Sequence, residues 1–407
     1  MRCLYLSSVL ILTLTFNLSG ADWPRFRGPN GTGVAEGSLP AINTASPLWH
    51  QVLPGKGVSS PIVVGGKLFV QSATDDGLTR LLLCLDAATG KTVWSRELPG
   101  KVAKKHNKNS FASGTPASDG ERVYCVSWDG DGISLHAYSL DGKDLWSQPL
   151  GGYVSQHGPG HSPAVYNGVV YVNVDDDQGA ALKAFDAQTG SPKWVANRKP
   201  YRASYSTPSL LERPGKPAEL LLGTTTEVTA YNPSTGSVVW SYPITWPAGQ
   251  MPLRVVGSPV YAGGLVICAC GDGGGSRYMV AINPEKSTPA KVWELKKGTP
   301  YVPAMLVKGN LLFWIADTGF ATCAEAKTGK VLWQERVATK EVTASPVLVG
   351  DKILMIAENG QYHILKAAPK FEVLESGTFG EPVFASPAVV DGKLYVRGTT
   401  QLFCFGK

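Results

Sequence analysis

The sequence has few charged residues and no long run of Lys or Arg. Charged side chains make up 17% of the 407 residues, and the net charge is only +6. A protein that binds nucleic acid through its phosphates needs a basic stripe or cluster on one face. We therefore expect no nucleic-acid partner, although the small positive excess favours acidic ligands or surfaces.

Long apolar stretches are also missing after the first residues. Residues 9–16 form a short apolar run, which follows Arg2 and precedes the small residues Ser19, Gly20 and Ala21. This pattern is typical of a cleaved export signal, and the run is too short to cross a membrane. We predict a signal peptide at residues 1–21 and a mature chain without a transmembrane segment. Because no cysteine follows Ala21, we expect no lipid anchor, and a soluble periplasmic or secreted protein.

Familiar catalytic motifs are absent as well. The sequence contains no Gly-x-Ser-x-Gly, no His-Glu-x-x-His and no phosphate-binding loop that opens a helix. The glycine-rich residues 271–275 suit a hairpin connection between two strands better than a phosphate site. We therefore predict no catalytic residues, and the absences favour a binding protein over an enzyme.

What the sequence does contain is a repeat. The 46 Gly and 29 Pro residues suit many short strands joined by turns, and the hydrophobic fraction of 43% is enough for a packed core. A start made of a hydroxyl residue, or once a valine, followed by proline recurs about every 47 residues, a period typical of propeller blades. The starts are Ser60-Pro61, Thr115-Pro116, Ser162-Pro163, Thr207-Pro208, Ser258-Pro259, Val302-Pro303, Ser345-Pro346 and Ser386-Pro387. Eight starts predict an all-β, eight-bladed propeller with four-stranded blades.

The second half of the repeat joins an acidic residue or Asn to Thr-Gly and then to Trp. In the first copy, Asp86 can bond its own turn, Gly90 can take a positive φ, and Trp94 can pack against a neighbouring blade. Further clear copies end at Trp194, Trp240 and Trp333, and looser ones at Trp146 and Trp293.

The repeat also gives the cysteines a place. Cys3 belongs to the predicted signal, and an even number remains, which in an exported protein suggests disulfides. However, Cys84, Cys323 and Cys404 occupy a small-residue position that is alanine in other blades, and Cys268 and Cys270 share one face of one strand. We expect free thiols throughout.

The last blade is incomplete at its C-terminal end. Residues 388–390, 393–397 and 401–405 supply three strands, and residues 47–53, with Trp49, match the missing outer strand. We predict that this N-terminal strand closes the ring. The domains are then a signal peptide at 1–21, an extension at 22–46 and the propeller at 47–407, and we expect a monomer.

The Asp/Asn-x-x-Thr-Gly-x-x-x-Trp unit resembles the tryptophan-docking repeat of the pyrroloquinoline-quinone (PQQ) propeller family over residues 47–407. The start at Asp22-Trp-Pro-Arg-Phe-Arg-Gly-Pro-Asn-Gly31 also resembles exported bacterial members. The resemblance implies one of two branches. They are the quinoprotein dehydrogenases and the non-enzymatic group of the outer-membrane assembly protein BamB.

The dehydrogenase branch usually carries an adjacent Cys-Cys pair, acidic and Asn ligands for Ca²⁺, and a catalytic Asp. Here the nearest equivalent of the pair is Cys268-Ala269-Cys270, and the main acidic run, at residues 175–177, follows a predicted strand. We expect that run to be a solvated turn. PQQ with Ca²⁺ therefore stays an alternative cofactor, and none is the primary prediction. The BamB branch normally has a lipid-anchoring cysteine, which is missing here.

In a propeller, the loops that enter the innermost strands gather at one mouth of the channel. These loops are rich in cationic and aromatic residues, which could bind an anionic small molecule, such as a tricarboxylate or acidic glycan, or an acidic segment of an envelope protein. The ligand-binding candidates are His106, His157, His161, Tyr201, Arg202, Tyr205, Arg254, Tyr301 and Lys340. His157 and His161 are spaced four apart, but a Gly/Pro loop fixes no metal geometry, so we predict no metal site.

Three functions are compatible with these features. The leading hypothesis is an exported, non-enzymatic binding or scaffolding module. The alternative is a PQQ-dependent dehydrogenase with an atypical site. The second alternative is a carbohydrate-binding propeller that uses Tyr201, Tyr205, Trp246 and Tyr301 as stacking surfaces.

Overall fold

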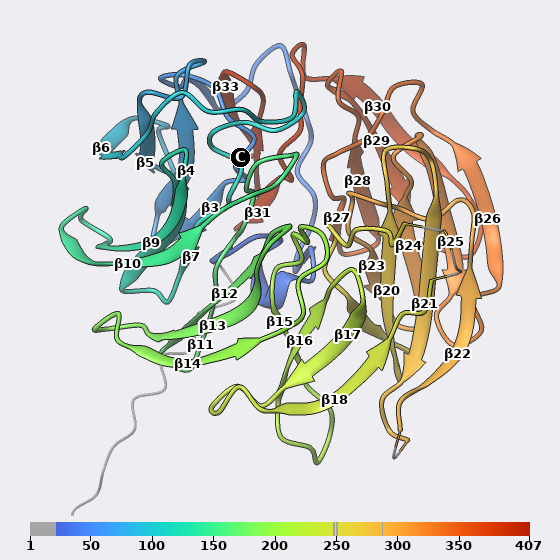
Figure 1. Ribbon diagram of the computed structural model, residues 1–407. Helices are drawn as coiled ribbons and strands as arrows, with labels where there is room; N and C mark the ends of the chain where they lie inside the picture. Colours follow the sequence, from blue (N-terminus) through green and yellow to red (C-terminus); the bar gives the residue numbers. More distant parts are fainter. Residues whose placement is uncertain (1–21, 247–248, 250, 287) are drawn as a thin grey trace, which may run out of the picture.

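The computed structural model describes residues 22–246, 249, 251–286 and 288–407, so the predicted signal peptide lies outside the described residues. Eight sheets stand around a central channel, and four antiparallel strands run from the channel outwards in each (Figure 1). One 3-10 helix, η1 (Pro29–Gly31), is the only helical element in the part of the chain that the structure describes. The predicted all-β, eight-bladed propeller is confirmed.

The strands alternate in direction within each blade, because short hairpins join neighbours. Blades 1 to 4 consist of β3 (Ile62–Val64), β4 (Lys67–Ala73), β5 (Arg80–Asp86) and β6 (Thr92–Leu98); β7 (Ala117–Ser118), β8 (Arg122–Trp128), β9 (Gly132–Ser139) and β10 (Asp144–Gly152); β11 (Ala164–Tyr166), β12 (Val169–Asp175), β13 (Ala180–Asp186) and β14 (Pro192–Asn197); and β15 (Ser209–Leu211), β16 (Glu219–Gly223), β17 (Glu227–Tyr231) and β18 (Val238–Pro243).

Blades 5 to 8 follow the same plan. They consist of β19 (Val260–Ala262), β20 (Leu265–Gly271), β21 (Arg277–Asn283) and β22 (Ala290–Leu295); β23 (Leu306–Lys308), β24 (Leu311–Ile315), β25 (Phe320–Glu325) and β26 (Val331–Arg336); β27 (Val347–Val349), β28 (Lys352–Ile356), β29 (Gln361–Lys366) and β30 (Val373–Thr378); and β31 (Ala388–Val390), β32 (Lys393–Arg397), β33 (Gln401–Phe405) and β2 (Trp49–Val52).

The ring closes as predicted, because β2 pairs with β33 in an antiparallel ladder from Trp49–Cys404 to Val52–Gln401. The last blade thus takes its outer strand from the N-terminal side of the chain, which removes an open sheet edge.

The tryptophans of the outer strands dock on the next blade. Trp49 donates a hydrogen bond of 3.2 Å from its indole nitrogen to the carbonyl of Ala87, and its ring lies against Gly90. A Cβ at Gly90 would come within 2.5 Å of that ring, and the φ of this glycine is 72°. The glycine of the repeat is therefore required both by its turn and by the neighbour's tryptophan. The same pairing joins Trp94 to Gly142, Trp146 to Gly190, Trp194 to Gly236 and Trp293 to Gly329.

The hydroxyls at the blade starts explain why Ser or Thr precedes the proline. The backbone N–H of Ser60 donates to the hydroxyl of Thr115 at 3.2 Å, and that of Thr115 donates to the hydroxyl of Ser162 at 2.9 Å. Each bond links one blade to the next around the channel, and all these groups are buried. The hydroxyls thereby satisfy N–H groups at the inner ends of the blades that no sheet pairing reaches.

The N-terminal extension crosses one end of the channel, where Figure 1 shows the blue segment inside the ring. It bonds to blade 1 through a bridge between Trp23 and Val63, and to blade 7 through β1 (Val34–Ala35), which runs parallel to β27. In between, the backbone N–H of Ser118 in blade 2 donates to the carbonyl of Pro24 at 2.8 Å. The extension is thus part of the folded ring and not a free tail.

The six cysteines of the described chain are all free and buried, as the repeat register predicted. Burial raises the pKa of Cys125 to about 12, so this thiol stays protonated and behaves as a small hydrophobic side chain. Among the described residues, no helix is long and apolar enough to cross a membrane.

Candidate functional site at the channel mouth

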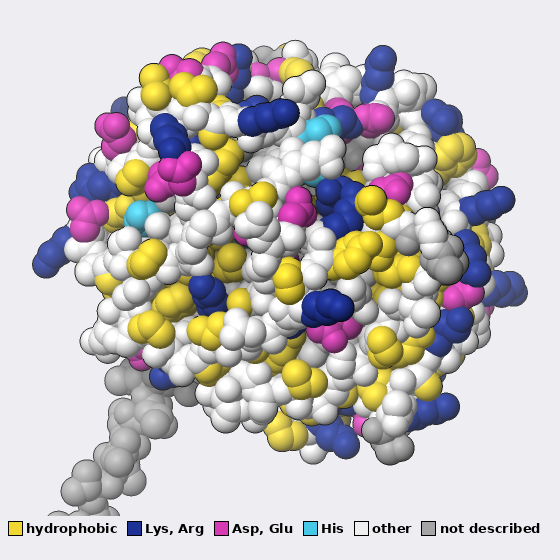
Figure 2. Space-filling model, viewed as in Figure 1, with side chains coloured by type: hydrophobic (Ala, Val, Ile, Leu, Met, Phe, Trp, Pro, Cys, Tyr) yellow, Lys and Arg dark blue, Asp and Glu magenta, His cyan; other side chains and the backbone are white. Residues whose placement is uncertain are grey.

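The loops that enter the inner strands come together at the mouth opposite the N-terminal extension. Two of them are joined by the predicted candidates His106 and His157, whose ring centroids are 5.0 Å apart. Asn109 holds the pair by donating from its side-chain amide to the carbonyls of His157, at 2.7 Å, and Pro159, at 3.0 Å. On the face in Figure 2, basic side chains and a histidine lie beside acidic and apolar ones near the middle of the molecule.

Arg202 and Arg254 are two cations of this mouth. The backbone of Arg254 forms a bridge with Gly271, the residue is 4% exposed, and its Nε has no hydrogen-bond partner in the part of the chain that the structure describes. Arg202 donates from Nη1 to the carbonyl of Pro252 at 2.9 Å. Burial lowers the pKa of Arg202, and the charge of nearby Arg254 lowers it further. Within the described residues, neither guanidinium lies in an ion pair with a carboxylate, so two mutually repelling charges remain available to an anion.

The histidines do not add to this charge. Burial, followed by the positive charge of Arg254, lowers the pKa of His157 to about 4. His161 is 3% exposed and lies behind the mouth, with its ring centroid 5.2 Å from that of Tyr153 and 5.8 Å from that of Tyr205. Burial lowers its pKa to about 4 as well. Both rings are therefore neutral near pH 7 and leave the positive potential of the mouth to the arginines.

The acidic run at residues 175–177 is structural, which corrects the prediction of a solvated turn. Asp175 is the last residue of β12, is 3% exposed and forms an ion pair with Arg198. Asp176 is 6% exposed and accepts hydrogen bonds from the backbone of its own turn and, at 3.2 Å, from the backbone N–H of Val154. Asp177 accepts a bond of 3.0 Å from the backbone N–H of Ala203. Two of these carboxylates therefore shape the loops that carry the mouth residues.

Tyr301 is also at the mouth, and its loop is held by Asp317. That carboxylate accepts hydrogen bonds from the backbone N–H groups of Tyr301, at 2.7 Å, and Val302, at 3.1 Å, and lies 3.5 Å from the guanidinium of Arg277. Burial raises the pKa of Asp317, and Arg277 opposes that shift.

The remaining candidates differ in accessibility. Tyr201 is 47% exposed beside Arg202, whereas Lys340 is exposed on the loop before β27 and makes no hydrogen bond or ion pair with the other candidates in the described part of the chain. Tyr205 is held in place through its hydroxyl, which bonds to Ser155 and to the carbonyl of Gly158, both at 3.1 Å.

The surfaces needed for sugar stacking are largely occupied. One face of Tyr205 is covered by His161, the ring of Tyr301 is packed against Gly271, and Trp246 meets Tyr278 edge-on at 5.7 Å. Of the four rings in the carbohydrate hypothesis, Tyr201 is the one that stands open.

The mouth does not fit PQQ with Ca²⁺. In the described ranges, no three His, Cys, Asp or Glu side chains converge as metal ligands. Cys268 and Cys270 are buried inside β20, within an apolar cluster, and their Sγ atoms cannot cover a ligand in the channel. Asp317, the carboxylate beside Tyr301, is already bonded to two backbone N–H groups. We derive no chemistry through the quinone.

A second feature, a cavity of about 1080 Å³ at the opposite end of the channel beside the N-terminal extension, was not among the predictions. Its polar centre is Arg25. The Arg-x-Arg pair in residues 22–31 is the sequence feature that could have indicated this cavity. Nothing in the repeat, however, indicated that the segment lies inside the ring.

Comparison with known proteins agrees with the architecture. The sequence model of the family described as "Outer membrane protein assembly factor BamB" matches residues 32–100, 80–335 and 317–405. The BamB of Shewanella oneidensis is 23% identical over 355 residues, which cover 83% of this chain and 82% of that protein. The dehydrogenase subunit of the quinone alcohol dehydrogenase of Gluconobacter oxydans is 29% identical over 146 residues, covering 33% of this chain and 18% of that protein.

Two solved structures have the same fold. BamB from Moraxella catarrhalis superposes with a TM-score of 0.66 and 13% identity, covering 89% of this chain and 99% of that one. The quinohemoprotein alcohol dehydrogenase of Comamonas testosteroni gives a TM-score of 0.65 and 14% identity, covering 95% and 80%. At such identities the likeness shows the fold alone, whereas the family match spans nearly all of the described chain. The chain belongs to the family of the outer membrane protein assembly factor BamB.

Proposed function

We propose that this chain is an exported, non-enzymatic scaffolding module that holds an acidic segment of an envelope protein at the channel mouth. The observation that carries the proposal is the pair Arg202 and Arg254, which lie close together without a carboxylate in an ion pair among the described residues. Arginine forms strong, oriented bonds with carboxylates, so an acidic segment would offset the repulsion between the two charges.

A protein partner suits the surroundings of this pair better than a small molecule does. Tyr201 beside Arg202 is 47% exposed, and Met251, next to the carbonyl that binds Arg202, is 62% exposed. Aromatic residues, methionine and arginine are the side chains that are enriched at protein interfaces. Export and a periplasmic location remain part of the proposal and rest on the signal-like residues 1–21 and on the family.

The test is site-specific photo-crosslinking in cells, with the photoreactive residue at position 201 or 251. We expect discrete crosslinked proteins that disappear when Arg202→Glu is added. Lys91→Glu is the matched control, because Lys91 is exposed on the hairpin between β5 and β6, far from the mouth. A crosslinking pattern that Arg202→Glu leaves unchanged would refute the proposal, as would dye-linked alcohol oxidation by the purified protein supplied with PQQ and Ca²⁺.

A further inference from the structure

The cavity beside the N-terminal extension exists because that segment bonds to some blades and passes over others. Besides blades 1, 2 and 7, it reaches blade 4, where Asn30 and Leu210 exchange hydrogen bonds of 2.9 and 2.8 Å. It also reaches blade 6, where Arg27 donates to the carbonyl of Met305 at 2.5 Å. Within the described residues the segment makes no hydrogen bond to blades 3 and 5, and residues 165–168 and 259–261, at the inner strands of these two blades, line the cavity of about 1080 Å³.

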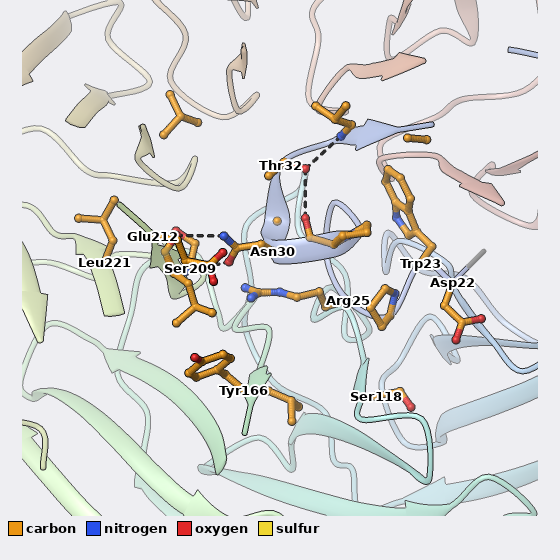
Figure 3. A pocket seen from close by; sticks show the side chains of 18 of the residues that line it. Asp22, Trp23, Arg25, Asn30, Thr32, Ser118, Tyr166, Ser209, Glu212 and Leu221 are labelled. Atoms are coloured by element: carbon orange, nitrogen blue, oxygen red, sulfur yellow. Dashed lines mark hydrogen bonds between the residues drawn. The ribbon is translucent and has the colours of Figure 1, made fainter. Parts of the chain in front are cut away.

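Among the described residues that line this space, Arg25 is the one cation. Arg25 extends from the segment towards blade 4 (Figure 3), is 7% exposed, and donates to the carbonyl of Pro208. Its Nε has no hydrogen-bond partner, and no carboxylate forms an ion pair with it within the described residues. Burial lowers the pKa of Arg25 to about 10, so it remains charged at neutral pH. A buried guanidinium without a counter-charge costs free energy that a bound anion would recover.

The walls are largely apolar, and the rim is acidic. Tyr166, Leu210, Val260 and Tyr261 line the cavity and are only partly buried, so they offer apolar surface to a ligand. Four carboxylates are among the lining residues: Glu36 and Glu212 are exposed at the edge, Asp22 is partly exposed, and Asp119 forms an ion pair with Arg122. A ligand with several negative charges would be repelled there, whereas one carboxylate could reach Arg25.

We infer that this cavity binds a monocarboxylate with an apolar or aromatic body, its carboxylate at Arg25 and its body against Tyr166 and Tyr261. The volume is of the size that holds a small organic molecule. The inference is independent of the proposed function, because this site lies at the other end of the channel from Arg202 and Arg254.

The test is calorimetric titration of the purified protein with 3-phenylpropanoate, its amide, citrate and the tripeptide Ala-Ala-Phe. We expect saturable one-site binding of 3-phenylpropanoate, with the amide and citrate each at least about tenfold weaker. The peptide distinguishes between two sources of a carboxylate with an apolar body, a protein C-terminus and a free small molecule. Tighter binding of the peptide would assign the carboxylate to a chain end, and tighter binding of the free acid would assign it to a small molecule.

Two variants test whether the ligand binds in this cavity. Arg25→Gln should lose binding at least about tenfold, while the matched control Arg27→Gln keeps it, because Arg27 does not line the cavity and its Nη atoms bond to carbonyls. If Arg25→Gln does not fold, Val260→Trp tests the same site by filling it and should abolish binding. The inference is overturned if the unmodified protein shows no saturable binding at about 10 mM, if citrate binds more tightly than 3-phenylpropanoate, or if neither Arg25→Gln nor Val260→Trp weakens binding.

Discussion

The backbone N–H of Ser386 donates a hydrogen bond of 3.0 Å to the hydroxyl of Ser60, which lies 326 positions earlier in the chain. This bond joins the last blade to the first at the edge of the channel, where both residues are buried. Together with the ladder between β2 and β33, it closes the ring from the inside as well as from the outside.

Replacing Ser60 with alanine should therefore destabilise the protein by about 1–2 kcal/mol, because the buried N–H of Ser386 loses its acceptor. The change is measured as a lower midpoint of denaturant unfolding. Ser95→Ala is the control, since Ser95 is exposed on β6 and its hydroxyl makes no hydrogen bond among the described residues. Equal midpoints for the two variants would contradict the role assigned to Ser60.

A second prediction follows from the contact between Trp49 and Gly90. Gly90→Ala should cost more than about 2 kcal/mol, because it adds a clash with the indole to the cost of a positive φ. Gly264→Ala separates the two effects, because Gly264 has a φ of 84° but nothing within 4 Å of its added Cβ. That control should cost only about 1 kcal/mol. If thermal or chemical unfolding shows the same loss of stability for both variants, the ring of Trp49 is not what excludes a side chain at position 90.

The buried His161 predicts a stability that falls in acid. Its folded pKa is about 4, below the ordinary value of 6.5, so between these values the unfolded chain binds a proton that the folded one does not. Stability should therefore decrease as pH drops from 6.5 towards 4, by up to about 1.4 kcal/mol per pH unit for this group. The carboxylate of Asp176 opposes the pKa shift without cancelling it.

His161→Phe, which preserves the packing against Tyr153 and Tyr205, should flatten the dependence of unfolding free energy on pH between 6.5 and 4.5. His50→Phe is the control, because His50 is exposed on β2. An unchanged slope in His161→Phe would show that this residue is not the neutral buried group described here.

The buried thiols should be unreactive in the native protein. Since all six cysteines of the described chain are buried and burial raises the pKa of Cys84, Cys125 and Cys323 to about 12, the native protein should react with less than one equivalent of a thiol reagent within minutes. In guanidinium chloride all six should react without prior reduction. A count that rises only after a reductant is added would reveal a disulfide.

The blades could be predicted from the sequence because each repeats the same local sequence pattern. The turn at Asp86 and Gly90, the tryptophan that follows, and the closing strand around Trp49 are all short-range patterns that recur, and the structure has them in the expected places. The gathering of His157, Arg202 and Arg254 followed from the same periodicity, because it fixed which loops share a mouth.

The path of the N-terminal extension, the burial of the acidic run and the protonation state of His157 depend on contacts that no local sequence pattern encodes. Residues 22–36 have no alternation, and their path was set by hydrogen bonds to distant blades, such as those between the side-chain amide of Asn30 and the backbone of Leu210. The carboxylates at 175–177 looked like a polar turn, yet Arg198 and two neighbouring loops bury or bind them. The lowered pKa of His157 comes first from its burial and then from the charge of Arg254, which belongs to another blade.

The N-terminal extension has a consequence for how the protein responds to mechanical force. Residue 23 is tied to blade 1 and residue 34 to blade 7, while β2, which begins fifteen residues further along, completes blade 8. A pull on residue 22 would load these attachments one after another before it reached the closing strand. The segment thus crosses the ring, and blade 8, which the N-terminal strand β2 completes, is protected from unravelling by bonds to its two neighbours and by those between Asn30 and Leu210 in blade 4, across the channel.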